Sequence, residues 1–278
     1  ARLFRGAGWV ALHSNLLDSK DNVQVMMRAA PLGNISHSHA DQNAIVLGAY
    51  GSPLLVNTGL RPWYGSPFCR EWYWTTKAHN ALEIYGKGQP RTAEGKGEVI
   101  VFRPGQEYDY VVGDASTAYG ANVERYRRHL VFLKPDVLVV ADEVKGKQPV
   151  TLKVWLHGRA PFQMNEGGGT IGLEYENAAL AGWILAPGGL RFAQTDKYTI
   201  PPEMGRPKPE WHFSAETKEP QASARAVTVL ATAKVGHRPE LEQAEDVSRG
   251  GSIAVRFRRG GKTRTVTINT TGPSVKVE

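Results

Sequence analysis

The stretch RHLVFLKPDVLVVADEV, residues 128–144, decides the fold class. Two apolar runs rich in valine and leucine flank the tetrapeptide LKPD at 133–136. Branched apolar residues favour strands, and a Pro-Asp pair between two such runs favours a tight turn. The stretch therefore predicts a β-hairpin made of two largely buried strands.

Similar runs recur along the whole chain, and clusters of Gly, Pro, Asn and Asp separate them. A second hairpin is predicted at RRGGK, residues 258–262, because Gly-Gly suits the tight turns that join antiparallel strands. Long segments with the helical period are scarce. The other strand-like runs are NVQVMMRAA, AIVLGAY, PLLVNTG, EVIVFRP, YDYVVGDAS, VTLKVWLHG, AVTVLATAKV and SIAVRFRRGGKTRTVTINT.

We therefore expect an all-β protein, a large antiparallel β-sandwich that spans residues 1–278. Residues 186–222 are rich in Pro and Gly and are expected to run over the surface. A sub-boundary could fall within 186–222, between a main sheet unit and a last group of strands.

Composition narrows the classes of function. The chain has 278 residues, 41% of them hydrophobic, which is enough for a large core. It has no apolar run of membrane-spanning length, so we expect a soluble protein. Its opening ARLFRGAGW lacks a signal-peptide pattern and an initiator Met, and the missing Met suggests a processed chain or a fragment. The single cysteine, Cys69, excludes an intrachain disulfide. The net charge of +7 suits an anionic partner, such as nucleic acid, a phosphorylated ligand or an acidic polysaccharide, and on charge alone simple solubility explains it equally well.

The segment HSHADQN places His37, His39 and Asp41 two residues apart. If this segment is extended, the three side chains share one face, and the apolar run AIVLGAY that follows would anchor them. Such a polar cluster is typical of a functional site. The alternative is a polar strand edge with hydrogen-bonded histidines.

A third histidine, His79 in TTKAHNALEIYG, could be brought next to His39 by sheet pairing. Two imidazoles and an oxygen ligand, from Asp41 or Asn57, make a plausible zinc site. An amide oxygen is a poorer zinc ligand than a carboxylate. The alternative is a structural network of His and Asn hydrogen bonds.

Residues 60–80 carry many aromatic side chains among basic ones, including Arg61, Trp63, Tyr64 and Arg70. Aromatic rings stack on the faces of sugars, and guanidinium groups bind carboxylate or sulfate with paired hydrogen bonds. Nucleic acid can use the same residues, and an aromatic corner of the core is the structural alternative. Tyr64 follows an expected turn, and a tyrosine hydroxyl near cations can carry a proton.

Three segments resemble the sheet domain of the heparinase II/III-like polysaccharide lyases: HSHADQN, SPLLVNTG, and YGSPFCREWYWTTKAHNALEIYGKGQ. That superfamily includes heparin, heparan sulfate and alginate lyases, in which an α/α toroid is joined to antiparallel sheets. The resemblance implies β-elimination on an acidic polysaccharide. It also implies a periplasmic or secreted bacterial protein.

The resemblance implies roles for individual residues. His37 corresponds to an active-site histidine, and Tyr64 is the closest match to a tyrosine that lines the cleft. His39, Asn57 and His79 occupy the positions that hold a structural zinc, although an Asp is usual at the position of Asn57. We expect Arg61, Arg70 and Trp63 to bind the acidic substrate.

The toroid of these lyases has no counterpart in the sequence, which lacks a run of amphipathic helices. The expected partners are therefore an acidic polysaccharide and a helical toroid domain, with no nucleic acid and no membrane. We expect the sheet domain of a polysaccharide lyase. The alternative is a β-domain that binds acidic polysaccharide without chemistry. A nucleic-acid-binding protein is less favoured, since HSHADQN has no use in phosphate binding.

Overall fold

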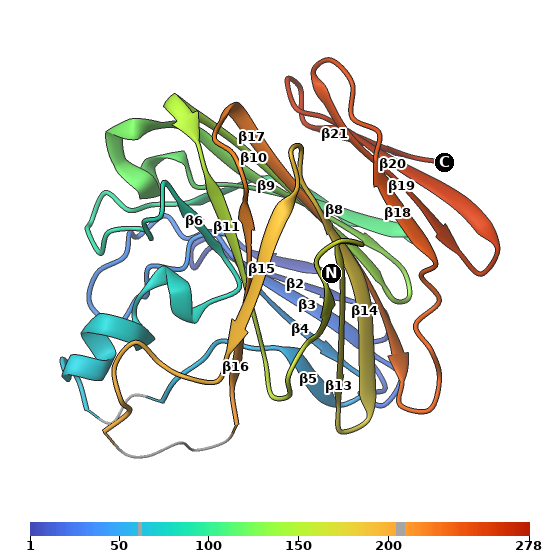
Figure 1. Ribbon diagram of the computed structural model, residues 1–278, viewed down its shortest axis with the longest axis horizontal. Helices are drawn as coiled ribbons and strands as arrows, with labels where there is room; N and C mark the ends of the chain where they lie inside the picture. The colour runs from blue at the N-terminus through green and yellow to red at the C-terminus, as the bar shows by residue number, and fades with distance from the viewer. Residues whose placement is uncertain (61–62, 204–208) are drawn as a thin grey trace.

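The computed structural model describes residues 1–60, 63–203 and 209–278 (Figure 1). Its regular structure is almost entirely strand, arranged in four sheets whose neighbouring strands run antiparallel. The expected all-β fold class is confirmed. Among the described residues, no helix has the length and apolarity needed to cross a membrane.

The N-terminal sheet is a five-stranded meander, in which each strand pairs with the next one along the chain. Its strands alternate buried and half-buried side chains, as expected for a sheet with one face toward the core. The strands are β1 (Arg2–Phe4), β2 (Trp9–His13), β3 (Val23–Arg28), β4 (Ala44–Ala49) and β5 (Ser52–Leu55).

The central sheet has eight strands and contains the hairpin that decides the fold class. Leu133 pairs with Val137 across the turn LKPD, so the predicted hairpin is confirmed. In spatial order the strands are β12 (Gln163–Asn165), β13 (Thr170–Tyr175), β14 (Ala178–Leu185), β17 (Gln221–Lys234), β10 (Val137–Val150), β9 (Val123–Leu133), β8 (Tyr108–Asp114) and β7 (Glu98–Arg103).

Two four-stranded sheets complete the fold. The side sheet comprises β15 (Leu190–Thr195), β16 (Trp211–Thr217), β11 (Leu152–Gly158) and β6 (Leu82–Ile84). The C-terminal sheet comprises β18 (Gln243–Asp246), β19 (Ser252–Arg259), β20 (Lys262–Asn269) and β21 (Ser274–Val277). The predicted RRGGK hairpin joins β19 to β20, where Gly260 and Gly261 have φ of 52° and 74°. Two consecutive positive φ angles match the tight turn that Gly-Gly favours.

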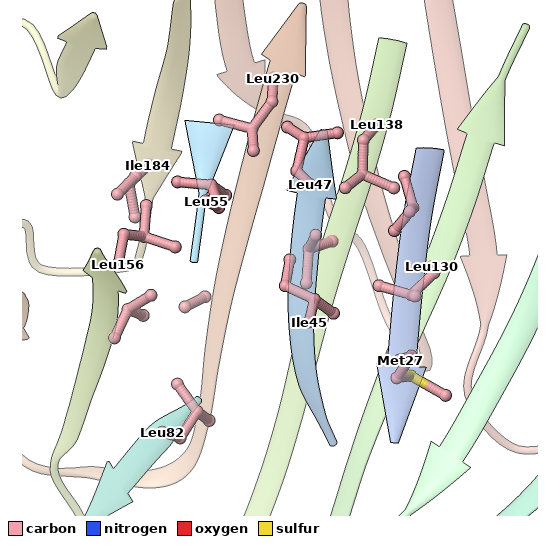
Figure 2. Close-up of a cluster of buried hydrophobic side chains, with 14 of the residues drawn as sticks. Met27, Ile45, Leu47, Leu55, Leu82, Leu130, Leu138, Leu156, Ile184 and Leu230 are labelled. Carbon is pink, nitrogen blue, oxygen red and sulfur yellow. The ribbon is translucent and has the colours of Figure 1, made fainter. Parts of the chain in front are cut away.

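The main core lies between the central sheet on one side and the N-terminal and side sheets on the other. Figure 2 shows leucines, isoleucines and a methionine from all three sheets meeting in this layer, such as Leu47 of β4, Leu156 of β11 and Leu138 of β10. Burying one such side chain stabilises the fold by roughly 1.5–3 kcal/mol. A hydrogen bond from Val56 N to His157 O, 3.0 Å long, joins the N-terminal sheet to the side sheet.

A second core lies on the opposite face of the central sheet, under the C-terminal sheet. Val139 and Val229 of the central sheet contact this layer, and Phe257 and Val266 of the C-terminal sheet close it. The middle strands of the central sheet are therefore buried on both faces.

The Pro- and Gly-rich segment 186–222 contains more regular structure than the expected surface excursion, because β15 and β16 lie within it, where β15 pairs with β16 and β16 pairs with β11. β14 precedes this segment and β17 follows it, and these two strands are hydrogen-bonded neighbours in the central sheet. The sub-boundary within 186–222 stays a prediction.

Candidate functional site

Residues 35–41 form a loop, so the expectation that His37, His39 and Asp41 share one face of a strand is wrong. The backbone turns here, because Ser38 N donates a hydrogen bond to Ile35 O and Ser36 has a φ of 56°. Strand β4 begins only at Ala44. As a result His37 is exposed, His39 is half-buried and Asp41 is buried.

His37 and Tyr64 are brought together at the surface, as the resemblance implies. Their ring centroids are 4.9 Å apart, and the Tyr64 hydroxyl donates to Ser36 O at 3.2 Å. Tyr64 in turn lies 5.0 Å from Trp74, measured between ring centroids. Because Tyr64 is 51% exposed, an imidazole and a phenol both face solvent, where a bound substrate could exchange protons with them.

Arg91 completes this stack and holds the loop around His37. Its guanidinium carbon lies 4.1 Å from the centroid of the Trp74 ring. Its Nη2 donates to Ser36 O at 2.6 Å and to Ser38 O at 3.1 Å, the carbonyls on either side of His37. Sequence reasoning missed Arg91, because a lone arginine after a proline in GQPRT carries no spacing pattern.

His39 and His79 lie next to each other, as the sequence predicted, and they form a hydrogen-bonded pair. His39 Nδ1 lies 2.9 Å from His79 Nε2, and His79 Nδ1 lies 2.8 Å from Thr75 O. A carbonyl can only accept, so His79 carries its proton on Nδ1 and accepts at Nε2. His39 therefore donates from Nδ1.

Burial keeps both of these rings neutral. Burial, followed by the neighbouring His79, lowers the pKa of His39 from 6.5 to about 4, against the opposing effect of Asp41. Burial also lowers the pKa of His79 to about 4, although its hydrogen bond to Thr75 O opposes the shift. At neutral pH the pair is therefore a neutral donor and a neutral acceptor.

The donor set around this pair fits a zinc ion only in part. Neutral imidazoles are zinc ligands, and the bond from His79 Nδ1 to a carbonyl is the orientation that metal-bound histidines use. Asp41 is taken by an ion pair with Arg28, and Asn57 offers only an amide oxygen. Among the described residues, no group of three or more His, Cys, Asp or Glu side chains could hold a metal.

Gln42 of the HSHADQN segment links the backbone beneath the loop to neighbouring segments through buried hydrogen bonds. Gln42 is fully buried, and its Nε2 donates to Asn34 Oδ1 and Gly95 O, both at 3.0 Å. Its backbone N–H donates to Gln89 Oε1 at 2.9 Å. The chain beneath the loop is therefore held in place by a network of buried hydrogen bonds. The spacing of polar residues in the sequence could not indicate this network.

Asn80, in the AHN segment, joins three parts of the fold. Its Nδ2 donates to Ile45 O at 2.8 Å and to Val56 O at 3.0 Å, and its Oδ1 accepts from His157 N at 2.7 Å. Arg128 Nη1 also donates to Asn80 O at 2.9 Å. This asparagine fixes the backbone next to His79.

A depression of about 460 Å³ opens beside His37, and His39, Asp41, Asn57 and Trp9 also line it.

Trp63 is 58% exposed and precedes Tyr64, where it could meet a sugar ring. Arg70 is exposed on the π-helical turn η1 (Cys69–Tyr73), and it is not among the described residues that line the depression. Arg61 lies outside the described residues.

The aromatic side chains near the short turns that follow Tyr64 form two groups, one buried and one exposed at the surface. Turn η1 and the 3₁₀ turn η2 (Thr76–Ala78) lie at the left of Figure 1, next to the side sheet. Phe68 and Trp72 are buried there and contact Tyr198, so this part of the segment is the aromatic corner that the sequence left as an alternative. Trp63 and Tyr64 remain at the surface. A third turn, η3 (Ser116–Asn122), precedes β9.

Comparison with solved structures shows a shared fold. A heparinase III with methylated lysines superposes with a TM-score of 0.79 at 16% identity, which covers 96% of this chain and 41% of that one. The heparan sulfate lyase HepC from Pedobacter heparinus superposes with a TM-score of 0.77 at 16% identity, which covers 96% of this chain and 42% of that one. The chain thus spans about two-fifths of the length of these enzymes.

No curated protein matches the chain. Residues 1–267 match the family model described as "Heparinase II/III-like, C-terminal". This match covers nearly the whole sequence, and the chain therefore belongs to the heparinase II/III-like C-terminal domain family.

Proposed function

We propose that this chain is the sheet domain of a polysaccharide lyase that cleaves a uronate-containing acidic polysaccharide by β-elimination. The observation that carries the proposal is the contact of His37 with Tyr64, 4.9 Å between ring centroids, on an exposed loop with a buried, hydrogen-bonded base. A rigid base matters because catalytic groups must keep a fixed geometry. The heparan sulfate lyases of the same fold support the substrate class.

The reaction removes the proton at C5 of the uronate and expels the oxygen at C4. The electron pair of the C5–H bond forms a C4–C5 double bond, and the departing oxygen takes up a proton. The C5 proton is weakly acidic, so stabilisation of the enolate that develops on the carboxylate should be a large part of catalysis.

In this scheme His37 acts at the uronate carboxylate or at C5, and Tyr64 carries a proton beside it. An imidazole suits either role, because it can donate or accept a proton near neutral pH. Arg61, Arg70 and Trp63 would bind the acidic chain. A helical domain would supply the opposite wall of the cleft.

The test joins the chain to the helical domain of a heparinase III and follows the ultraviolet absorbance of the unsaturated uronate. Heparan sulfate, heparin and alginate serve as substrates. His37→Ala should lower the rate about 100-fold or more, the scale of general acid–base catalysis. His13→Gln, at a half-buried histidine of β2, is the matched control and should leave the rate unchanged. Undiminished turnover by His37→Ala would contradict the proposal.

The alternative is a domain that binds acidic polysaccharide without chemistry. It is favoured by one observation: the helical structure of the described residues is limited to the three short turns η1, η2 and η3. In that case the joined protein should bind heparan sulfate and release no unsaturated product. Binding by the wild type and by His37→Ala would then be equal.

A further inference from the structure

One part of the central sheet has an outer face that the C-terminal sheet leaves open. The C-terminal sheet covers β8, β9, β10, β17 and the end of β14 that carries Trp183 and Leu185, and it builds the second core on this face. On β12, β13 and β14 the same face borders a groove of about 670 Å³, a volume typical of ligand pockets. Figure 1 places β13 and β14 at the lower right, far from the turns around residues 60–80 at the left.

Small side chains form the floor of this groove. Gly172 of β13 pairs directly with Ala181 of β14, and Ala179 lies two residues further along the same face. The atoms nearest to a Cβ added to Gly172 belong to the Gln163 side chain and to the Leu180 carbonyl, at 3.5–3.6 Å, which is ordinary van der Waals contact. The floor is therefore low and flat, and a ligand ring can lie close to the backbone.

The walls carry one aromatic ring and several planar polar groups. Trp183, half-buried, lines one part of the groove, and the amides of Gln163 and Asn165 line the β12 side. The facing wall is the segment 236–242, which presents His237 and Arg238. This wall is fixed, because Leu241 is buried in the second core.

The charges in the groove nearly cancel, in contrast to the net charge of +7 on the whole chain. Arg238 and Glu174 have opposite signs, and Glu242 forms an ion pair with Arg258 at 3.0 Å. A densely sulfated chain or a nucleic acid would gain little here. Asn165 Oδ1 already accepts from Gly168 N at 3.1 Å, but a purely apolar ligand would offer no partner to the Asn165 amide nitrogen, the Gln163 amide or the His237 imidazole.

We propose that this groove is a binding site for a short, weakly charged saccharide segment, separate from the site at His37. A sugar ring stacks its C–H face on Trp183 above the glycine and alanine floor. Neighbouring hydroxyls pair with the amides of Gln163 and Asn165, and a single carboxylate sits at Arg238. The proposal goes beyond the lyase reaction and does not depend on it, since binding here requires no chemistry at His37.

The test is calorimetric titration of the whole chain with a hyaluronan tetrasaccharide, which has one carboxylate on every second sugar, and with cellotetraose, which has none. Gly172→Leu fills the floor and should weaken binding of both oligosaccharides about ten-fold, or about 1.4 kcal/mol. Arg238→Gln should weaken the hyaluronan tetrasaccharide alone. Thr263→Leu, which adds the same side chain at an exposed position of β20, is the matched control and should bind as the wild type does.

Thermal melting establishes that each variant is folded, and Ala181→Leu replaces Gly172→Leu if the latter is not. Failure of the wild type to bind either oligosaccharide would overturn the proposal. Equal binding by the wild type and the floor-filling variant would also overturn it, because the ligand would then lie elsewhere. His37→Ala should keep full binding, so a failure of the lyase proposal and a failure of this one are separate results.

Discussion

Burial holds both His39 and His79 neutral in the folded chain, where they form a hydrogen bond. In the unfolded chain a histidine has a pKa of about 6.5, whereas in the folded chain the pKa of each ring is lowered to about 4. Below pH 6.5 the unfolded chain therefore binds protons that the folded chain does not. Stability is full above about pH 6.5 and falls as the pH decreases toward about 4.

The expected loss is about 3 kcal/mol for one such histidine, and the two are coupled, so their contributions do not simply add. Melting temperatures measured between pH 7 and pH 4 check this, and the conservative variant His39→Gln should flatten the profile. Because other buried histidines such as His157 also have a lowered pKa, the informative quantity is the difference between variant and wild type. A wild type whose stability does not change over this range would contradict the burial argument.

Asn57 decides whether the histidine pair can hold zinc. It is exposed and lines the same depression as His39, and it replaces the carboxylate expected from the family resemblance. We expect Asn57→Asp to bind about one zinc per chain, because a carboxylate completes a ligand set of two imidazoles and one oxygen. Elemental analysis and a rise in melting temperature with added zinc are the measurements.

The control for zinc binding is Asn57→Asp combined with His79→Gln, which should lose the metal again. Stoichiometric zinc in the wild-type chain would show that the amide is a sufficient ligand. In that case zinc would replace the proton that His39 donates to His79, and binding would release protons.

At the scale of elements, Arg91 determines the order of the loop that carries His37. Ser36 has a positive φ, which is strained for a residue with a Cβ, and its carbonyl accepts from both Arg91 and Tyr64. Arg91→Ala should speed amide hydrogen exchange in residues 35–39 about ten-fold or more, equivalent to about 1.4 kcal/mol, and leave β4 protected.

The variant Arg91→Lys tests whether the positive charge of Arg91 or the planar shape of its guanidinium group orders the loop. A lysine keeps the positive charge but lacks the planar group that stacks on Trp74 and reaches two carbonyls. Exchange as fast as in the alanine variant would support the geometric role. Wild-type exchange in both variants would mean that other contacts order the loop.

The elements that could be predicted from the sequence are those fixed by local chemistry. Continuous apolar runs rich in valine and leucine identified β9 and β10, and Gly-Gly identified the β19–β20 turn, because these preferences act between near neighbours. The proximity of His37 and Tyr64 was expected from the family resemblance, and that of His39 and His79 already from the strand-like sequence around His79. The interpretation of residues 35–41 as a strand was wrong, because buried hydrogen bonds of Gln42 to Gln89 and Gly95, far along the chain, override local alternation. Arg91 and the groove on β12–β14 depend on tertiary placement and left no local pattern.

At the scale of the whole molecule, the charge of the groove on β12–β14 differs from that of the chain as a whole. The groove on β12–β14 is nearly neutral, whereas the chain carries 34 Lys and Arg against 27 Asp and Glu. Many surface cations are paired with a carboxylate, such as Arg256 with Glu245 at 2.9 Å. Exposed pairs of this kind are weak, so a polyanion can still compete for the cation.

We therefore expect the chain to bind heparin through its overall positive charge and to release it as salt increases. The screening length shrinks from about 10 Å at 0.1 M to about 3 Å at 1 M ionic strength, which removes long-range attraction between exposed charges. Elution from immobilised heparin along a salt gradient measures this. His37→Ala and Gly172→Leu should elute close to the wild-type position, since neither variant removes a Lys or an Arg. Elution of His37→Ala at lower salt would mean that heparin binds at the His37 site. Elution of Gly172→Leu at lower salt would mean that heparin binds in the groove on β12–β14.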